Sequence, residues 1–266
     1  WKINPDNNKA SGGQGMKVLA CYSMKGGVGK TATAVNVAWM AANAGMKTLL
    51  IDLDPQGASS YYFKVKPAKK DWSERFFKAY EHLLEHIKHS EFAGLDVIPA
   101  HLGFRQFDVL LDALGKRKSR LDNILKGLKD EYDLVILDCP PTIGNLAESI
   151  FNASDYILAP VIPTTLSERT FDQLNAFFEE HDYPKKKLVP FFSMVQAQKA
   201  LHRHTMETLR ARSDRFLYSA IPFTSDIEKM GEHQTPVMLF APNGKGAKAF
   251  ATLWVELQPL LREFED

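Results

Sequence analysis

A glycine-rich loop with two lysines near the start of the sequence has the composition of a phosphate-binding loop. Residues 24–31 read MKGGVGKT and stand between an apolar run and a helical pattern. The glycines let the backbone amides turn inward, and the amino end of the following helix adds its dipole, so the loop favours phosphate oxygens. Lys30 would then reach the β- and γ-phosphates of ATP, and the Thr31 hydroxyl would bind Mg²⁺. The residues predicted to contact the nucleotide here are Lys25, Gly26, Gly27, Val28, Gly29, Lys30, Thr31 and Ala32.

The first lysine of this loop predicts a dimer. The usual loop begins with a glycine six residues before its phosphate lysine, but Met24 stands at that place and Lys25 follows it. A lysine at the mouth of the loop would add little to the phosphates of its own subunit, but it could reach phosphates bound to a facing subunit. We therefore expect two copies of the chain to enclose the nucleotide between them.

Three aspartates stand at the ends of two further apolar runs, where they could complete such a site. Asp52 and Asp54 end the run from Leu49, and the two-residue period of a strand points them to the same side. A carboxylate here can orient a water for attack on the γ-phosphate, because phosphoryl transfer needs positioning and charge neutralisation. Asp138 has the place of a Walker B aspartate, which usually holds Mg²⁺ through water. Aspartates at strand ends also cap helices, but the phosphate loop favours the functional interpretation.

Short apolar runs alternate with helical patterns from Met16 onward, which predicts βα units stacked around a mainly parallel sheet. Runs such as residues 134–137 are apolar on both faces, as a parallel strand covered by helices must be. The predicted fold is therefore α/β and P-loop NTPase-like, with a mainly parallel twisted sheet and helices on both faces. Ligands of such folds bind at the carboxyl ends of the strands, where these motifs lie.

The predicted elements extend over most of the chain. Strands are expected at residues 17–23, 47–52, 95–99, 132–138, 156–161, 188–194 and 216–221. Helices are expected, among others, at residues 30–44, 73–89, 104–114, 119–129, 167–181, 201–212 and 245–263. No repeat or long linker divides the pattern, so residues 16–266 are expected to form one domain. Residues 1–15 are polar and glycine-containing, and we expect them to be a vector-derived tail.

The overall composition excludes some classes of protein. With 33 basic and 32 acidic side chains, the chain lacks the basic excess of a dedicated nucleic-acid-binding protein, so any DNA binding must come from a local patch. Cys21 and Cys139 have no CxxC spacing and are expected to be buried free thiols. No apolar run approaches the ~20 residues of a membrane span, and the first residues do not resemble a signal peptide. These features predict a cytoplasmic protein.

The sequences KGGVGKT, LLIDLDPQG and LVILDCPP together resemble the motifs of the ParA/MinD family of deviant Walker ATPases, and in particular its ParA branch. The resemblance extends from Met16 over nearly the whole chain. It implies an ATP-dependent sandwich dimer with weak hydrolysis. It also implies that the dimer binds DNA without sequence preference and that a cargo-bound adaptor protein stimulates turnover.

The resemblance assigns a role by position to each residue of the site. Lys25 becomes the signature lysine, Lys30 the phosphate lysine, Thr31 the magnesium ligand, Asp54 the water-positioning residue, Asp52 its supporting acid and Asp138 the Walker B acid. The purine pocket corresponds to Met194, Pro222 and Phe223. Three positions depart from the family: Met24 replaces the usual Gln, Ala32 the usual Thr and Phe223 a frequent Arg. These departures indicate a divergent or orphan member, and they leave the cargo open: a plasmid, a chromosome region or a protein assembly such as a carboxysome.

Late basic residues are the candidates for DNA binding, and they predict association with the nucleoid. The resemblance implies that six of them lie on one face of the dimer: Arg203, Arg210, Arg212, Arg215, Lys245 and Lys248. A modest patch doubled by dimerisation would bind DNA in a salt-sensitive way. The triplet Lys185–Lys187 is more typical of a solvated loop.

Three alternatives remain at this stage. His82, His86 and His89 share one face of the expected helix, but no HExxH motif supports a metal site, and a solvated surface is favoured. A MinD-like membrane ATPase would need a C-terminal amphipathic helix with a basic polar face, whereas residues 253–266 are acidic and interrupted by Pro259. An iron–sulfur relative would need suitably spaced cysteines, which are absent.

Overall fold

The computed structural model describes residues 15–115 and 117–262, and within them eight strands form one sheet. The strand order is β3-β4-β2-β5-β1-β6-β7-β8, and every pairing except the contact of β3 with β4 is parallel. The strands are β1 (Lys17–Cys21), β2 (Thr48–Asp52), β3 (Lys88–His89), β4 (Leu95–Ile98), β5 (Leu134–Asp138), β6 (Tyr156–Val161), β7 (Leu188–Val195) and β8 (Ala220–Pro222). The predicted α/β fold with a mainly parallel sheet is confirmed. The predicted tail, apart from Gly15, lies outside the described residues.

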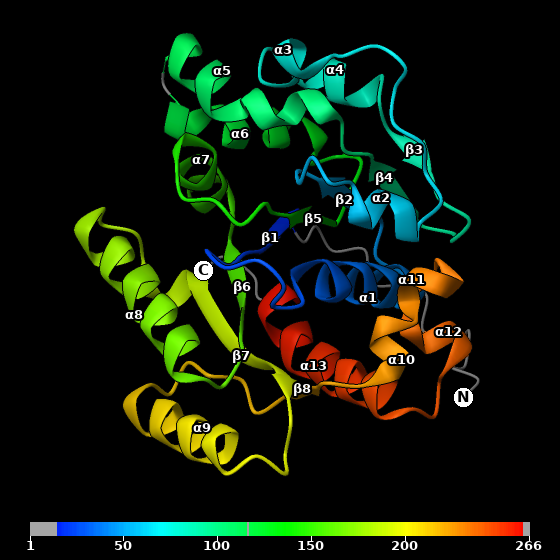
Figure 1. Ribbon diagram of the computed structural model, residues 1–266. Helices are drawn as coiled ribbons and strands as arrows, with labels where there is room; N and C mark the ends of the chain where they lie inside the picture. The colour runs from blue at the N-terminus through cyan, green and yellow to red at the C-terminus, as the bar shows by residue number, and fades with distance from the viewer. Residues whose placement is uncertain (1–14, 116, 263–266) are drawn as a thin grey trace.

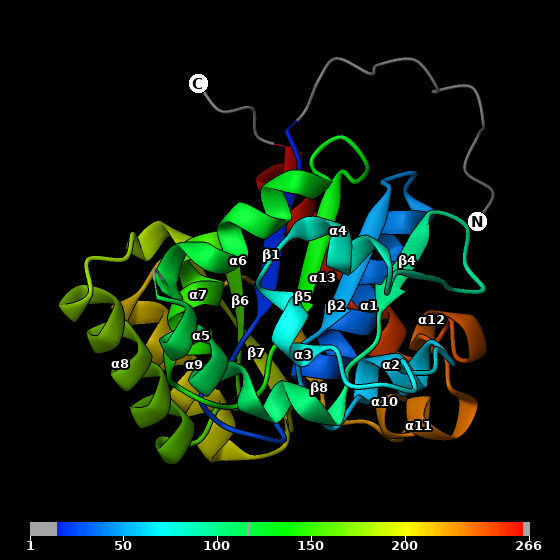
Figure 2. The ribbon, with the colours of Figure 1, turned by 90° about the horizontal axis from the view of Figure 1, so that it is seen from above.

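Helices cover both faces of the sheet (Figure 1). One face carries α1 (Lys30–Asn43) and α13 (Lys245–Arg262), with the short helices α10 (Ser225–Glu228), α11 (Met230–His233) and α12 (Val237–Phe240) beside them. The other face carries α5 (Phe107–Leu114), α6 (Arg117–Leu125), α7 (Asn145–Ala153), α8 (Thr165–Glu180) and α9 (Ala200–Arg212). Figure 2 shows the same two layers from above. The short helices α2 (Ala58–Tyr62), α3 (Ser73–Phe76) and α4 (Tyr80–Leu84) follow β2.

The central strands are apolar because both of their faces are covered. All five residues of β5 are buried, and so are those of β1 and β2. Alternate residues of β5 join two different clusters: Val135 packs among residues of α5, α6 and α7, whereas Leu134 and Ile136 pack among residues of α1 and α13. Burial on both faces holds these three strands in register, and their carboxyl ends carry the site.

The helix predicted at residues 73–89 is wrong. The segment forms α3, α4 and the edge strand β3, in which Lys88 pairs with Val97. Adjacent aromatic residues explain the break, because Phe76 and Phe77 are both buried against the ring of Phe107, at centroid distances of 4.8 Å. Neighbouring side chains of one continuous helix point about 100° apart, so leaving the helix after Phe76 brings both rings into one cluster.

Other differences concern the ends of elements. The strand predicted at residues 216–221 is shorter and shifted to β8, and the helix predicted at 104–114 begins with a 3₁₀ segment, Leu102–Gln106. A second 3₁₀ segment, Lys126–Leu128, lies within residues 119–129, which were expected to form one helix. A third, Lys185–Lys187, directly precedes β7.

The helix predicted at residues 245–263 is confirmed as far as Arg262, and Pro259 does not interrupt it, because α13 runs through this proline. Leu257 and Leu261, on either side of Pro259, are both buried against the α1 face of the sheet. Their packing offsets the backbone hydrogen bond that a proline removes near the end of a helix. No helix in residues 15–115 and 117–262 is both long and apolar enough to cross a membrane.

Candidate functional site

The strand order brings the predicted loop and acids to one edge of the sheet. β5 lies between β1 and β2, and Asp138 is the register partner of both Cys21 on β1 and Asp52 on β2. The glycine loop follows β1 and ends where α1 begins at Lys30. Asp54 follows β2 by two residues. Residues from three separate parts of the chain therefore meet at neighbouring strand ends.

The glycines of the loop are required by backbone conformation and by space. Gly27 and Gly29 have φ angles of 68° and 92°, in the left-handed region that other residues rarely adopt. A Cβ atom at Gly29 would lie 2.8 Å from Ser193 Oγ on β7, which is too close for non-bonded contact. The Lys25 amide donates to Ser23 Oγ at 3.2 Å, which ties the start of the loop to the end of β1. The loop is thus built as a compact turn at the amino end of α1.

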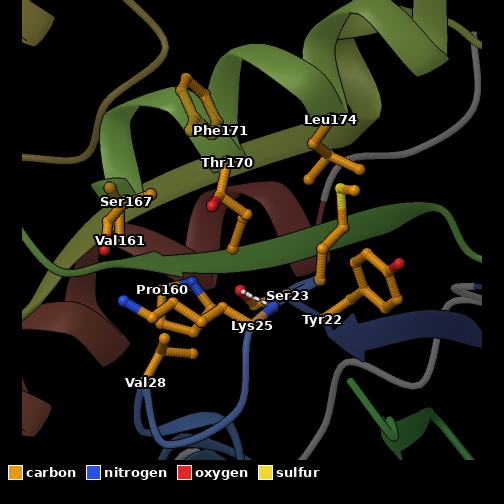
Figure 3. A pocket seen from close by; sticks show the side chains of 12 residues that line it. Tyr22, Ser23, Lys25, Val28, Pro160, Val161, Ser167, Thr170, Phe171 and Leu174 are labelled. Carbon is orange, nitrogen blue, oxygen red and sulfur yellow. Dashed lines mark hydrogen bonds between the residues drawn. The ribbon is translucent and has the colours of Figure 1, made fainter. Parts of the chain in front are cut away.

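The two lysines of the loop lie in different surroundings. Lys30 is buried, and its Nζ donates to the Lys25 carbonyl oxygen at 3.4 Å. A buried ammonium group requires further acceptors, which phosphate oxygens would supply. Lys25 is only half-buried and lines a small pocket with Pro160 of β6 and Thr170 of α8 (Figure 3). Met24 lines the same pocket, so the residue that replaces the usual glycine packs towards α8.

Asp138 has the environment of a metal-binding carboxylate. It is buried, its Oδ2 accepts a hydrogen bond from the Ser59 hydroxyl, and its Oδ1 has no partner within the described residues. Burial raises the pKa of Asp138, whereas the nearby hydroxyls of Ser59 and Thr31 and the charge of Lys30 lower it. A buried carboxylate oxygen without a hydrogen bond is costly, and a cation would offset that cost.

The two acids after β2 are distinguished by their exposure. Asp52 is fully buried, and its Oδ2 accepts hydrogen bonds from the amide and the hydroxyl of Ser60, at 2.9 and 2.6 Å. Burial, and then the charge of Asp138, raise the pKa of Asp52. Asp54 is partly exposed, and its Oδ1 accepts from the Gln56 amide at 3.0 Å. Asp54 is therefore the acid of this pair that water can reach, whereas Asp52 supports the strand end.

These residues fit a magnesium-bound nucleotide. The glycine turn supplies backbone amides at a helix amino end, and Lys30 supplies a buried positive charge. Thr31 and the unpaired Oδ1 of Asp138 supply oxygen ligands of the type that Mg²⁺ takes in nucleotide sites. When bound, Mg²⁺ would neutralise phosphate charge.

The residues assigned to the purine lie together at the ends of β7 and β8. Met194 has a positive φ of 54°, Val195 is the register partner of Pro222, and the Phe223 amide donates to the Val195 oxygen at 3.0 Å. The Phe223 side chain is 46% exposed, so its ring is open to a ligand. Ser193 connects this corner to the phosphate loop through its close approach to Gly29. A base at this corner would therefore adjoin phosphates in the loop.

Three serines at the site were not found from the sequence. Ser59 and Ser60 hold Asp138 and Asp52, and Ser193 limits the space at Gly29. The signal for the first two was available, because they follow the acidic motif after only a few residues. No local sequence pattern indicates Ser193, because its contact with the loop depends on the position of β7.

The four arginines proposed for DNA are engaged in contacts within the chain. Arg203 donates to the Ala197 oxygen at 2.8 Å, and Arg210 donates to the Tyr218 oxygen at 2.9 Å. Arg212 pairs with Glu168 and Asp172 of α8, at 2.6 and 2.9 Å. Arg215 donates to Asn175 Oδ1 at 2.7 Å and to the Lys185 oxygen at 3.1 Å. These arginines mainly join α9 and the loop after it to their neighbours.

The two lysines of the proposed patch are in a different situation. Lys245 and Lys248 are exposed on the first turns of α13, and neither has an ion pair with another described residue. In the triplet Lys185–Lys187, Lys185 pairs with Glu179, and Lys187 donates to the Phe151 oxygen at 3.2 Å. Among these basic residues, Lys245, Lys248 and Lys186 are exposed without an ion pair to another described residue, so these three are the most available to a polyanion.

The histidines do not form a metal site. His82 contacts Arg75, His86 stacks on Trp72 at a centroid distance of 3.8 Å, and His89 contacts Asp96. Within residues 15–115 and 117–262, no group of three or more His, Cys, Asp or Glu side chains is arranged to hold a metal ion. Cys21 and Cys139 are buried and free, as expected.

Comparison with known proteins shows which family the chain resembles and which relatives share its length. Residues 16–189 match the model of a family described as "AAA domain". The sporulation initiation inhibitor protein Soj of Bacillus subtilis is 28% identical over 255 residues, which cover 91% of this chain and 98% of Soj. The chromosome partitioning protein ParA of Myxococcus xanthus is also 28% identical over 255 residues, covering 91% of this chain and 87% of that protein.

A solved structure has the same fold. It is a putative plasmid partition protein from Borrelia burgdorferi bound to AMPPNP, with a TM-score of 0.75 and 22% identity, covering 92% of this chain and 99% of that one. Since the identity is low, this likeness concerns the arrangement of the elements.

Proposed function

The chain belongs to the ParA/MinD family of deviant Walker A ATPases, and from this premise we propose that it is a dimerising ATPase that positions or segregates a cargo. In this proposal ATP and Mg²⁺ join two copies, the dimer binds DNA without sequence preference, and a cargo-bound adaptor stimulates slow hydrolysis. The observation that carries the proposal is the meeting of Lys30, Asp54 and the unpaired Asp138 Oδ1 at one edge of the sheet.

Each residue of the site has a separate task in the proposed mechanism. The loop amides and Lys30 bind the phosphates of their own subunit, and Thr31 and Asp138 would hold Mg²⁺. Asp54 orients the attacking water, since it is the acid of the pair that is partly exposed, and Asp52 supports it from the buried end of β2. Lys25 neutralises charge on the phosphates of the facing subunit, and its partial exposure at the mouth of the loop is compatible with that role.

DNA binding is assigned to the exposed lysines of α13. Dimerisation would bring two copies of this patch onto one particle, so that each copy adds its phosphate contacts to those of the other. The cargo, whether a plasmid, a chromosome region or a protein assembly, would be recognised through the adaptor. On this proposal the dimer resides in the cytoplasm on the nucleoid.

A MinD-like membrane role is less compatible with the fold. Phe250, Trp254 and Leu257 of α13 are buried against the sheet, so they are not available to a bilayer. An interfacial helix needs such residues on a free face. The C-terminal helix thus acts here as part of the core.

Light scattering with and without AMPPNP and Mg²⁺ tests the proposal. The mass should rise from that of one 30.0 kDa chain to about twice that value. Lys30→Ala is the matched control, because it lacks the proposed phosphate lysine, and it should stay monomeric at the same nucleotide concentration. A wild-type chain that stays monomeric at saturating nucleotide would contradict the sandwich dimer.

A further inference from the structure

Two adjacent serines on α2 each donate to a different buried carboxylate. The Ser59 hydroxyl donates to Asp138 Oδ2, and the Ser60 hydroxyl donates to Asp52 Oδ2 at 2.6 Å. Both serines are buried, with exposures of 0% and 4%. The short helix α2 is thus joined by side-chain hydrogen bonds to the ends of both β5 and β2.

The two serines differ in what they join. Ser60 Oγ also accepts from the Ala100 amide at 3.0 Å, so this hydroxyl connects Asp52 to the segment after β4. The Ser59 hydroxyl has only one proton, and that proton is donated to Asp138 Oδ2. The other oxygen of the same carboxylate, Oδ1, remains without a partner among the described residues. Ser59 therefore holds one oxygen of Asp138 and leaves the other, Oδ1, facing no donor among the described residues.

The same helix is continuous with the loop that carries Asp54. The Gly57 amide donates to the Asp54 carbonyl oxygen at 2.9 Å, and the Tyr61 amide donates to the Gly57 oxygen at 3.0 Å. The turn that begins at Asp54 therefore leads directly into α2, with no unbonded residues between them. A shift of α2 relative to Asp138 would move Asp54 as well.

We propose that Ser59 is a positioning residue that holds Asp138 in the orientation needed for Mg²⁺ and ties the Asp54 loop to that carboxylate. The proposal rests on the ATPase function above and adds a residue to it. A carboxylate with one oxygen held by a donor loses rotational freedom, so its other oxygen is directed before the metal arrives. Partners of metal ligands in this position typically change metal affinity about 10- to 100-fold when they are removed.

The test is a Mg²⁺ titration of the binding of a fluorescent ATP analogue. In Ser59→Ala, the Mg²⁺ concentration for half-maximal enhancement of binding should rise about 10- to 100-fold. Analogue affinity in EDTA should stay at the wild-type value, which also shows that the variant is folded. Ser59→Thr keeps the hydroxyl and should restore the wild-type midpoint. Hydrolysis by Ser59→Ala at saturating Mg²⁺ should remain about tenfold slower, because Asp54 is less well placed.

The matched control is Ser154→Ala. Ser154 is also buried, and its hydroxyl donates to the Ile150 oxygen at 2.7 Å, away from the site. Its removal should leave the Mg²⁺ midpoint unchanged. An unchanged midpoint in Ser59→Ala, or an equal shift in Ser154→Ala, would overturn the role toward the metal. Hydrolysis by Ser59→Ala at the wild-type rate at saturating Mg²⁺ would overturn the proposal that Ser59 also positions the Asp54 loop. If the wild-type chain shows no Mg²⁺-dependent binding, the proposed function itself fails.

Discussion

The sheet edge that carries the glycine loop and the late basic segments differ in how the positions of their charged residues are determined. At this edge, Asp52 and Asp138 are buried at neighbouring strand ends, and Lys30 is buried at the start of α1. In the late segments, basic residues differ in their surroundings. Arg212 is ion-paired within the chain, whereas Lys248 is exposed without an ion pair to any described residue. The order of the strands determines where the residues of the edge lie. The availability of a late basic residue depends on which side chains and carbonyl groups surround it.

This difference shows that whether a basic residue can bind DNA phosphate depends on the partners it already has within the chain. An arginine that is ion-paired to carboxylates, as Arg212 is, already has its charge partly neutralised, so it gains less from a DNA phosphate than an unpaired cation does. A lysine without such partners loses little when it binds a polyanion. Four predictions test the comparison, beginning with the largest expected effect.

Lys30→Ala should abolish tight nucleotide binding. On the proposed function, the buried ammonium group would make charge-assisted hydrogen bonds to phosphate oxygens, so its loss should weaken ATP affinity at least about 100-fold, or about 2.7 kcal/mol. Lys25→Ala should bind ATP within about threefold of the wild-type affinity but fail to dimerise. Fluorescence titration and light scattering measure the two properties. Equal losses of nucleotide affinity in both variants would contradict a role of Lys25 in trans.

Asp54→Ala should stop hydrolysis without releasing the nucleotide. A group that orients the water typically contributes about 100-fold or more to the rate, so phosphate release should fall by at least that factor. The dimer formed with ATP should persist, because the phosphates are held by other residues. Phosphate release and the mass of the ATP complex are the measurements. Hydrolysis at the wild-type rate would show that another residue organises the water.

Reversing the charge of both Lys245 and Lys248 to Glu should weaken DNA binding while dimerisation remains intact. Affinity should fall about tenfold or more at low salt, and the log–log salt slope should decrease by up to about 3.6, because the four substituted side chains of a dimer no longer neutralise DNA phosphates. Fluorescence anisotropy with DNA duplexes of two unrelated sequences measures both quantities. Lys185→Glu with Lys186→Glu is the charge-matched control and should have a smaller effect. Binding that is equally tight without nucleotide would contradict the assignment.

Arg210→Ala should change stability more than DNA affinity. Its guanidinium donates to the Tyr218 oxygen and lies 5.2 Å from the centre of the Phe192 ring, so its removal leaves a carbonyl without its donor. The free energy of unfolding should fall by about 1–3 kcal/mol, measured by denaturant titration. DNA affinity should stay within about threefold. The reverse pattern would place Arg210 in the DNA patch.

Much of the fold could be predicted because parallel strands covered on both faces are almost wholly apolar. The run from Leu134 to Asp138 is therefore unambiguous, and β6 was predicted with its observed ends. Residues 73–89 were predicted wrongly because their apolar positions fit a helix equally well, and only packing against Phe104 and Phe107 divides the segment. At Pro259 the local rule was overridden by the burial of Leu257 and Leu261.

The sequence by itself predicted the glycine loop, the three acids and the alternation of most strands and helices along the chain, because these depend on residue type at short spacing. Only the tertiary structure decided that Ser59 donates to Asp138, that Ser193 limits the space at Gly29, and that Arg212 is paired with α8. These contacts join residues far apart in the chain. Their geometry depends on how strands and helices pack, and spacing along the sequence carries no information about that packing.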